Sequence, residues 1–359
     1  IVYSCTKAAT ALCAHMLVER GLLDYDMLVG DLWPDFATAG KEETTVAMML
    51  SHTSPVPHLR DPIRSGGIAD WDYMVDRVAA EETHWQPGTR QGYHGLTYAW
   101  TVGQLVRLAA GKPLSAFFRD EVATPLGLDF HIGLPESEEP RVAPMIASDP
   151  SEVNFKGRFF KAVTTEPGSL PQLFLTNQGK ANFNSREIHA AEIGSANGIT
   201  NARGLAGMYA PLANGGGTLL QAETVQRMSR VCAATQMDAV LMQPMRFSMG
   251  FMASTDNRRQ GGDSIILGDG GFGHVGMGGS IGWAVAPFLV LGMAGPLGWR
   301  GALLGAALLG FLVTALIIAQ KDIDTDGHRL AATADPATRA AAAVAAPGWK
   351  VLLTLAVVM

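Results

Sequence analysis

The distribution of charge along the chain changes abruptly after Trp283 and separates two unlike parts. In the first part, charged residues are dispersed, and turns rich in glycine and proline separate short periodic segments, which is typical of a globular protein. In the second part, the only charged residue before Gln320 is Arg300. We therefore expect two domains, a globular one over residues 1–283 and an apolar one over residues 284–359.

The apolar part contains a run long enough to span a membrane. Residues Gly301–Ala319 carry no charge, and at about 1.5 Å per residue a helix of this kind crosses a hydrocarbon core of about 30 Å. The composition predicts a transmembrane helix and membrane association through residues 284–319, with a buried core helix as the alternative. Residues 321–346 indicate a flexible linker, and Trp349–Met359 begins another apolar run.

Composition and charge exclude several classes of function. The chain has 359 residues, of which 48% are hydrophobic, so it can bury a sizeable core. Its net charge of −6 provides no basic surface for a nucleic acid. The cysteines, Cys5, Cys13 and Cys232, are odd in number and lack C-x-x-C spacing, so neither a disulfide framework nor a zinc or redox motif is expected. A reducing compartment such as the cytoplasm fits this usage in the first domain.

Hydrophobic periodicity predicts the main elements of the first domain. We expect helices over Cys5–Arg20, Asp70–Ala80, Leu96–Ala110 and Gly204–Asn214, and strands over Phe247–Ala253 and His274–Trp283. Gly21 follows the first helix as a C-terminal glycine would. Residues Glu136–Glu192 are polar and without clear periodicity, which indicates a long irregular insertion.

The segment Ser4-Cys5-Thr6-Lys7 is the only S-x-x-K in the chain. Residues three apart share one face of a helix, so the amine of Lys7 can lie beside the hydroxyl of Ser4. A desolvated lysine has a lowered pKa and can accept the proton of a serine nucleophile. The alternative is that Ser4 caps a helix and Lys7 is a solvated residue of its first turn.

Two glycine-rich segments offer partners for this pair. Tyr93 follows a Pro-Gly turn, and as a buried tyrosinate or a hydrogen-bonded phenol it could relay protons; the alternative is a core aromatic residue. Residues Gly271–Gly279 lead into a strand along which a substrate can lie. There the amide of Met277 could share an oxyanion hole with the amide of Ser4, unless the segment is only a glycine-rich loop.

Taken together and in order, these segments resemble the S-x-x-K, Y-x-N and K-T-G motifs of the serine β-lactamase and penicillin-binding protein superfamily. The variants Tyr93-His94-Gly95 and His274-Val275-Gly276 are similar to the class C-like esterase branch, the family VIII carboxylesterases. Further stretches agree with the same family: Met49–Ser54, Pro87–Thr89 and Gly194–Ile199. The resemblance covers residues 1–283. It implies an α+β fold, an antiparallel sheet beside a helical domain, with the N-terminal strands of the sheet missing.

The resemblance also implies an activity. Ser4 would be the acylated nucleophile, and Lys7 and Tyr93 would be its base and proton relay, with their division of labour open. We expect a serine hydrolase that cleaves short-chain carboxylic esters, a small-molecule substrate class, through an acyl-enzyme. The alternatives are a β-lactam hydrolase or penicillin-binding-type protein, and, from another class, a catalytically incomplete chimeric protein with a transporter-derived tail.

Two departures from the family pattern favour esters over β-lactams. His274 occupies the position of the K-T-G lysine, which replaces a permanent cation with a group that is mostly neutral near pH 7. Gly95 replaces the asparagine that contacts the substrate amide in β-lactamases. The resemblance further implies that Gly276 and Met277 line the acyl pocket and that Met277 supplies an oxyanion N–H.

Other motifs in the chain are weaker. Gly278–Gly282 fits the G-x-S-x-G elbow around Ser280, but this elbow needs a following helix and a later histidine, and the only one is His328, beyond the apolar run. Residues 268–273 match G-x-G-x-x-G without a following βαβ unit, so no dinucleotide site is expected. No cofactor is expected.

No metal site is expected either. The chain lacks H-E-x-x-H, and the pairs His52 with His58 and His189 with Glu192 form no cluster at ligand spacing.

The two ends of the first domain raise a further expectation. The chain begins at the nucleophile motif without a Met, which indicates a truncated N-terminus. After Trp283 the closing strands and final helix implied by the resemblance do not appear, and residues 297–301 and 347–350 resemble parts of a multi-span transporter. Our hypothesis is a truncated hydrolase joined to a transporter fragment, with a membrane-anchored hydrolase as the alternative.

Overall fold

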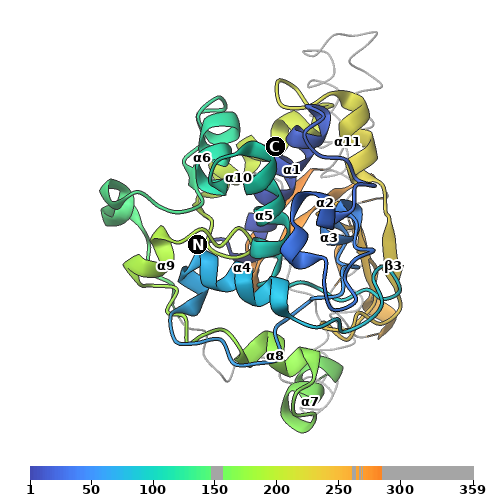
Figure 1. Ribbon diagram of the computed structural model, residues 1–359. Coiled ribbons are helices and arrows are strands. Elements are labelled where there is room, and N and C mark those ends of the chain that lie inside the picture. The colour runs from blue at the N-terminus through green and yellow to red at the C-terminus, as the bar shows by residue number, and fades with distance from the viewer. Residues whose placement is uncertain (147–156, 261–263, 267, 269, 285–359) are drawn as a thin grey trace, which may run out of the picture. The chain divides into compact units, whose positions relative to one another are not determined.

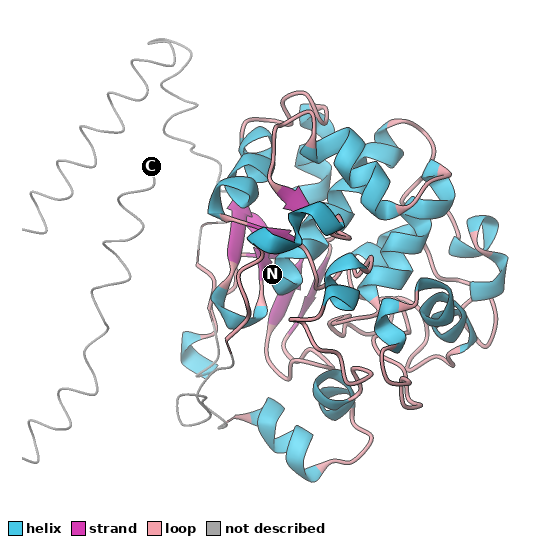
Figure 2. Ribbon diagram, turned by 90° about the vertical axis from the view of Figure 1, so that its left-hand side faces the viewer, coloured by secondary structure: helices cyan, strands magenta, loops and turns pink. Residues whose placement is uncertain are grey.

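An antiparallel sheet with strand order β3-β4-β5-β6-β7 forms one side of the fold, and most of the helices lie on the other (Figures 1 and 2). The computed structural model describes residues 1–146, 157–260, 264–266, 268 and 270–284. The strands of this sheet are β3 (Ala233–Thr235), β4 (Met245–Phe247), β5 (Met252–Ala253), β6 (Phe272–Val275) and β7 (Ile281–Ala284). A smaller pair joins β1 (Phe130–His131) to β2 (Ile199–Thr200).

The helices follow one another along the chain with short turns between them. They are η1 (Tyr3–Cys5), α1 (Thr6–Glu19), α2 (Val29–Leu32), η2 (Pro34–Phe36), α3 (Val46–Leu50), η3 (Gly67–Ala69), α4 (Trp71–Ala80), α5 (Tyr98–Ala110), α6 (Leu114–Phe118), the π-helical η4 (Arg119–Ala123), η5 (Glu136–Arg141), α7 (Arg158–Thr165), α8 (Leu170–Thr176), α9 (Arg186–Ala190), α10 (Ala202–Ala213), α11 (Ala222–Ser229), η7 (Arg258–Gln260) and η8 (Met277–Gly279).

Helix α1 is the centre of the core. Every residue from Thr6 to Leu17 is buried, and the helix packs against α5, α6, α11 and β6. The sequence predicted this helix from hydrophobic periodicity, which is typical of a helix with one buried face, whereas the structure buries it on all sides. Its many alanines explain this difference, because small side chains let neighbouring elements approach closely from every direction.

The periodic helices confirm the sequence predictions to within a few residues. Asp70 caps α4 by accepting from the amide of Tyr73, and Asn201 caps α10 by accepting from the amide of Gly204. Gly21 follows α1 at a φ of 70°, a left-handed conformation that glycine adopts without steric cost. Local caps and long apolar stripes therefore allowed the bounds of these helices to be predicted from the sequence.

The strand predictions were wrong in detail. Phe247–Ala253 is not one strand: β4 and β5 pair through Phe247 and Met252, and a tight turn lies between them. His274–Trp283 likewise forms the end of β6, the turn η8 and the start of β7, with His274 opposite Gly282. Runs this short contain too few residues for an alternating pattern to separate a strand from a hairpin.

The supposed irregular insertion contains helices. Residues 136–192 include η5, α7, α8 and α9. Serines cap two of them, since Ser169 accepts from the amide of Gln172 and Ser185 from that of Ile188. Helices of five to eight residues are marginal alone and depend on such caps and on tertiary packing, which composition does not reveal.

Within the described residues, no helix has the length and apolar character needed to cross a membrane. The run Gly301–Ala319, the linker 321–346 and the transporter-like stretches lie outside the described residues. The first domain of the sequence prediction, residues 1–283, falls within the compact unit Ile1–Ala286.

Candidate active site

Ser4 lies in η1, the single turn that leads into the buried helix α1. It is partly exposed, whereas the flanking Val2 and Cys5 are buried. The preceding residue, Tyr3, has a φ of 42°, a left-handed conformation that is uncommon for a residue with a side chain. Strain of this kind concentrates at functional sites, where the surrounding fold maintains it. Ser4 thus follows a constrained backbone position and directly precedes the buried helix.

Lys7 lies in the first turn of α1, and its side chain is fully buried. Its Nζ lies 3.1 Å from Oγ of Ser4 and donates to the carbonyl oxygens of Gly95 at 2.7 Å and Ser195 at 2.9 Å. The sequence predicted the contact with Ser4 but not the two carbonyl contacts. Gly95 and Ser195 lie in two of the stretches that resembled the family, and the structure brings both to this one amine.

The environment of Lys7 favours its neutral form. Burial lowers the pKa of Lys7 well below its usual value, because the ammonium loses its hydration. A neutral amine has two N–H groups and one lone pair, and carbonyl oxygens can only accept. Since Gly95 and Ser195 take the two N–H groups, the lone pair is left for the hydroxyl of Ser4. This arrangement allows Lys7 to take the Ser4 proton.

Tyr93 approaches the same pair from the loop between α4 and α5. It is 4% exposed, and the centre of its ring is 4.9 Å from Nζ of Lys7. Burial raises the pKa of Tyr93, and a hydrogen bond with Ser4 offsets part of that rise. The raised pKa favours the hydrogen-bonded phenol over the tyrosinate, the two forms considered from the sequence.

Three successive backbone amides hold Tyr93 in place. Gly92 donates to the carbonyl oxygen of His52, Tyr93 to Oδ1 of Asp238, and His94 to Nδ1 of His52, each at 3.1 Å. His52 belongs to a stretch that resembled the family, but its contact with this loop was not predicted. The position of the phenol is therefore set by two residues distant in sequence.

Asp238 is a buried carboxylate that sequence reasoning missed. It is 0% exposed and also accepts from the amides of Val240 and Leu241, each at 2.9 Å, and from Nε2 of Gln91 at 3.3 Å. Burial raises the pKa of Asp238, although these hydrogen bonds counteract the rise. No motif surrounds this aspartate, so only the three-dimensional structure reveals its role.

His274 lies on β6 beside the tyrosine, and the centres of the His274 and Tyr93 rings are 6.0 Å apart. Burial lowers its pKa to about 3, so the imidazole is neutral near pH 7. Nδ1 is 2.7 Å from the carbonyl oxygen of Val275 and must carry the proton, which leaves Nε2 as an acceptor. This Nε2 is buried and has no hydrogen-bond partner among the described residues.

Gly276 and Met277 lie where β6 passes into η8. A Cβ on Gly276 would lie 2.1 Å from Oγ of Ser280 and 2.3 Å from the carbonyl oxygen of Val2, so only glycine fits. The amide of Gly276 donates to the carbonyl oxygen of Ser280 at 2.7 Å. The side chain of Met277 is 53% exposed. Because η8 packs against η1, this turn adjoins the segment that carries Ser4.

Ser280 is not a nucleophile elbow. It lies between η8 and β7, not between a strand and a helix. Its hydroxyl donates to the carbonyl oxygen of Val2 at 2.7 Å, which anchors the start of the chain. The structure therefore leaves Ser4 as the serine with a buried amine beside it.

The described residues contain one group with the spacing of metal ligands, Asp129, His131 and Glu138. Arg141 donates to both carboxylates, so a cationic side chain already lies beside them. His189, one of the ligands weighed from the sequence, instead contacts Glu139 through Nδ1 at 2.7 Å.

Comparisons with known proteins agree with this geometry. A scan against protein families matches residues 1–287 to the family described as Beta-lactamase. The chain is 34% identical over 307 residues to the esterase/beta-lactamase LipL of Mycobacterium tuberculosis. This alignment covers 79% of the chain but only 65% of the length of that relative.

Solved structures give the same result. A family VIII carboxylesterase aligns with a TM-score of 0.67 and 33% identity, covering 79% of this chain and 73% of the other. A penicillin-binding protein homologue from Caulobacter crescentus aligns with a TM-score of 0.69 and 31% identity over the same shares of each chain. None of these matches supports the transporter resemblance predicted for the C-terminal part.

Proposed function

Because the chain belongs to the beta-lactamase family, we propose that residues 1–283 form a serine hydrolase that cleaves short-chain carboxylic esters through an acyl-enzyme on Ser4. The observation that carries this proposal is the contact between Ser4 and Lys7. A fully buried amine lies 3.1 Å from the hydroxyl of a partly exposed serine. The alternative from the sequence, a solvated lysine in a helix cap, requires an exposed side chain and does not fit.

In the acylation step, Lys7 is the base and Tyr93 the proton relay. Oγ of Ser4 attacks the carbonyl carbon of the ester while its proton passes to the lone pair of Lys7. The tetrahedral intermediate then collapses, the bond to the leaving alcohol breaks, and the alkoxide takes a proton from Lys7 by way of the Tyr93 hydroxyl. Both side chains are then in their starting protonation states, and the acyl group remains on Ser4.

Deacylation runs the same chemistry with water. A water molecule attacks the acyl carbonyl and gives its proton to Lys7, directly or through Tyr93, and the Ser4 oxygen recovers a proton as it leaves. In both steps we assign the oxyanion to the backbone amides of Ser4 and Met277. The packing of η8 against η1 supports this assignment, because it sets the two amides in adjacent turns.

Esters are favoured because the site offers no permanent cation at position 274. A β-lactam carries a carboxylate, and a neutral imidazole with a bare Nε2 accepts hydrogen bonds and does not attract that group. β-Lactam hydrolysis remains a second candidate, favoured by the similarity to the esterase/beta-lactamase LipL.

The test is hydrolysis of p-nitrophenyl butyrate and nitrocefin by the chain and by Ser4→Ala, together with labelling by a serine-directed fluorophosphonate. We expect butyrate turnover and labelling that both disappear in Ser4→Ala, and slower or no turnover of nitrocefin. Labelling that persists in Ser4→Ala would rule out Ser4 as the nucleophile. Nitrocefin turnover faster than butyrate turnover would favour the second candidate.

A further inference from the structure

The aromatic ring of Phe174 lies directly on the backbone of Gly95. An ideal Cβ on Gly95 would lie 2.1 Å from Cε2 and 2.3 Å from Cδ2 of this ring, far inside any normal contact. Gly95 is not in the left-handed conformation that favours glycine. The absence of a side chain at position 95 is therefore required by Phe174, and the ring occupies the space that such a side chain would fill.

Phe174 also lies beside residues that contact the proposed catalytic amine. Its ring centre is 6.1 Å from that of Tyr93, and the carbonyl of the underlying Gly95 binds Nζ of Lys7. Phe174 is partly buried, so one part of the ring packs on the catalytic loop while another faces outward.

The surroundings of Phe174 extend this apolar surface. Leu170, one turn earlier on α8, packs against the same cluster as Phe174, and Val275 of β6 joins it. From α7, Phe159 meets the Phe174 ring edge-on at 5.9 Å between centres. Helices α7 and α8 pack against each other (Figure 1). The surface formed by these side chains is apolar. An amide in an acyl chain that lay against it would find no hydrogen-bond partner there.

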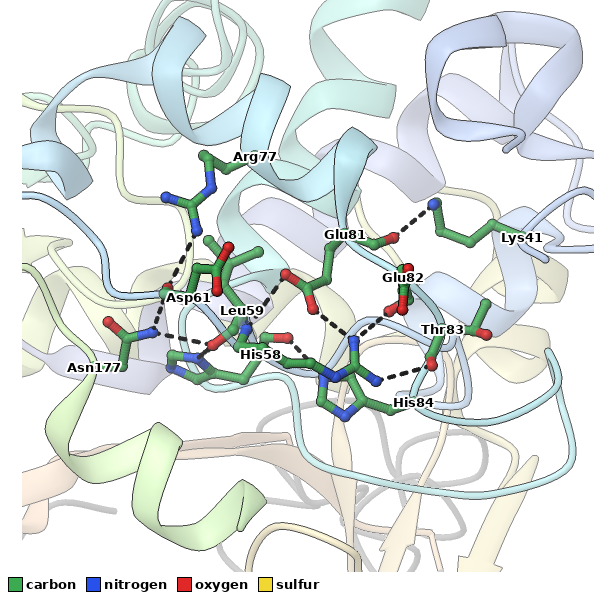
Figure 3. A network of polar contacts seen from close by, with 11 residues as sticks. Lys41, His58, Leu59, Asp61, Arg77, Glu81, Glu82, Thr83, His84 and Asn177 are labelled. Carbon is green, nitrogen blue, oxygen red and sulfur yellow. Dashed lines mark hydrogen bonds and ion pairs between the residues drawn. The ribbon is translucent and has the colours of Figure 1, made fainter. Parts of the chain in front are cut away.

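The far end of α8 is fixed by Asn177 (Figure 3). Its Oδ1 accepts from the amide of Ile63 at 2.8 Å, and its Nδ2 donates to the carbonyl oxygens of Leu59 and Asp61, each at 3.0 Å. The Asp61 carbonyl also accepts from Arg77 at 3.1 Å. Three hydrogen bonds from one side chain therefore hold the end of α8 to a single loop.

That loop is itself tied to the chain after α4. Arg60 pairs with Glu81 at 2.6 Å and donates to the carbonyl oxygens of Glu82 at 2.8 Å and Thr83 at 2.9 Å. Figure 3 shows Glu81, Glu82 and Thr83 on one side of the loop and Asn177 on the other. Because α8 is bound to an anchored loop, the Phe174 ring has a defined position above Gly95.

We propose that Phe174 is the specificity-determining residue of the site, selecting esters with short apolar acyl groups, and that Asn177 is its positioning residue. The proposal rests on the proposed function, since it describes how that site selects its acyl group. The ring limits the length of the acyl chain by closing one side of the site. It disfavours acyl groups with an amide or charge near the carbonyl, because nothing on the ring can bind them.

The test is the ratio of kcat/KM for p-nitrophenyl octanoate to that for p-nitrophenyl butyrate, measured per active site titrated with fluorophosphonate. We expect Phe174→Ala to raise this ratio by about tenfold or more, the scale of one to several methylene contacts. Leu175→Ala, the neighbouring residue on the same helix and 36% exposed, is the matched control and should leave the ratio unchanged. If Phe174→Ala does not fold, the same ratio is measured for Phe174→Leu, which should also raise it.

For Asn177→Ala we expect a shift of the ratio in the same direction and of smaller size. A purely structural role would lower the number of titratable sites and leave the ratio per site unchanged, which would refute the positioning role. Active wild-type enzyme with an unchanged ratio in both Phe174 variants would overturn this proposal alone. A wild-type chain that hydrolyses no ester would overturn it together with the proposed function.

Discussion

The carboxylate of Asp238 accepts the backbone N–H of Tyr93 at 3.1 Å across 145 positions of sequence. The two residues come from opposite halves of the fold, the helical region and the turn between β3 and β4. Their contact means that Tyr93, the proposed proton relay, is held by the side of the molecule that also carries the sheet. The geometry of the site therefore depends on the correct docking of these two regions.

We predict that Asp238→Ala destabilises the protein more than Asp238→Asn does. Alanine leaves several buried N–H groups without an acceptor, at a cost of about 1–3 kcal/mol for each. Asparagine keeps an oxygen at Oδ1, where three amides donate. Urea unfolding monitored by circular dichroism measures the free energy of unfolding of the two variants. Equal losses of unfolding free energy in the two variants would contradict the hydrogen-bonding role.

Lys7→Met should abolish catalysis while most molecules remain folded. The methionine fills a similar volume but offers neither a lone pair for Ser4 nor N–H groups for Gly95 and Ser195. Loss of a positioned base typically lowers the rate by about 10²–10⁴-fold. We expect kcat/KM for p-nitrophenyl butyrate and the rate of fluorophosphonate labelling to fall in parallel. Unchanged labelling with a native circular dichroism spectrum would show that Lys7 is not the base.

The pH dependence of kcat/KM should have a single rising limb that ends well below pH 10.5. Lys7 acts in its neutral form, and burial lowers its pKa, so the active fraction increases with pH until it reaches a plateau. The raised pKa of Tyr93 predicts no falling limb from its ionisation below pH 10. Tyr93→Phe is expected to lower the plateau and keep the position of the limb. A limb centred near the usual lysine pKa would contradict this prediction.

Buried histidines predict that the protein loses stability in mild acid. Burial lowers the pKa of His15 and His58 to about 4, and that of His94 and His274 to about 3. Unfolded histidines titrate near 6.5, so as the pH falls below that value the unfolded state takes up protons first. Each group then costs about 1.4 kcal/mol per pH unit until its folded pKa is reached.

The contribution of these buried neutral histidines to the free energy of unfolding is complete above about pH 6.5. It decreases as the pH falls toward 4. Urea midpoints measured from pH 8 to pH 4 test it, and His15→Gln, a residue away from the site, should flatten the profile. A midpoint that stays constant down to pH 4 would show that these side chains are solvated in solution.

Gly95→Ala should destabilise the protein, and Phe174→Ala should relieve that cost. The added methyl group collides with the ring, and overpacking of this kind costs about 1–3 kcal/mol. In the double variant the space is free, so the two changes should show a strong favourable coupling in a double-mutant cycle. Additive losses of unfolding free energy would mean that Phe174 does not lie on Gly95.

The residues that sequence reasoning proposed for the site are those with local signals. The spacing of Ser4 and Lys7, the Pro-Gly turn before Tyr93 and the glycines after His274 are all visible within a few residues. Asp238 and Phe174 have no such signals, because they act through partners from distant segments. The helices α7 and α8 were missed for a related reason, since their stability comes from caps and packing and not from a long apolar stripe.

The burial of α1 on all sides has a practical consequence. Its backbone amides can exchange with deuterium only when the centre of the domain opens, so they should be among the slowest to exchange. The Ser4–Lys7 pair sits at the first turn of that same helix. A reagent that captures Ser4 would then count molecules whose central helix is correctly packed. One covalent label would serve both as an activity assay and as a gauge of how much of a preparation has folded.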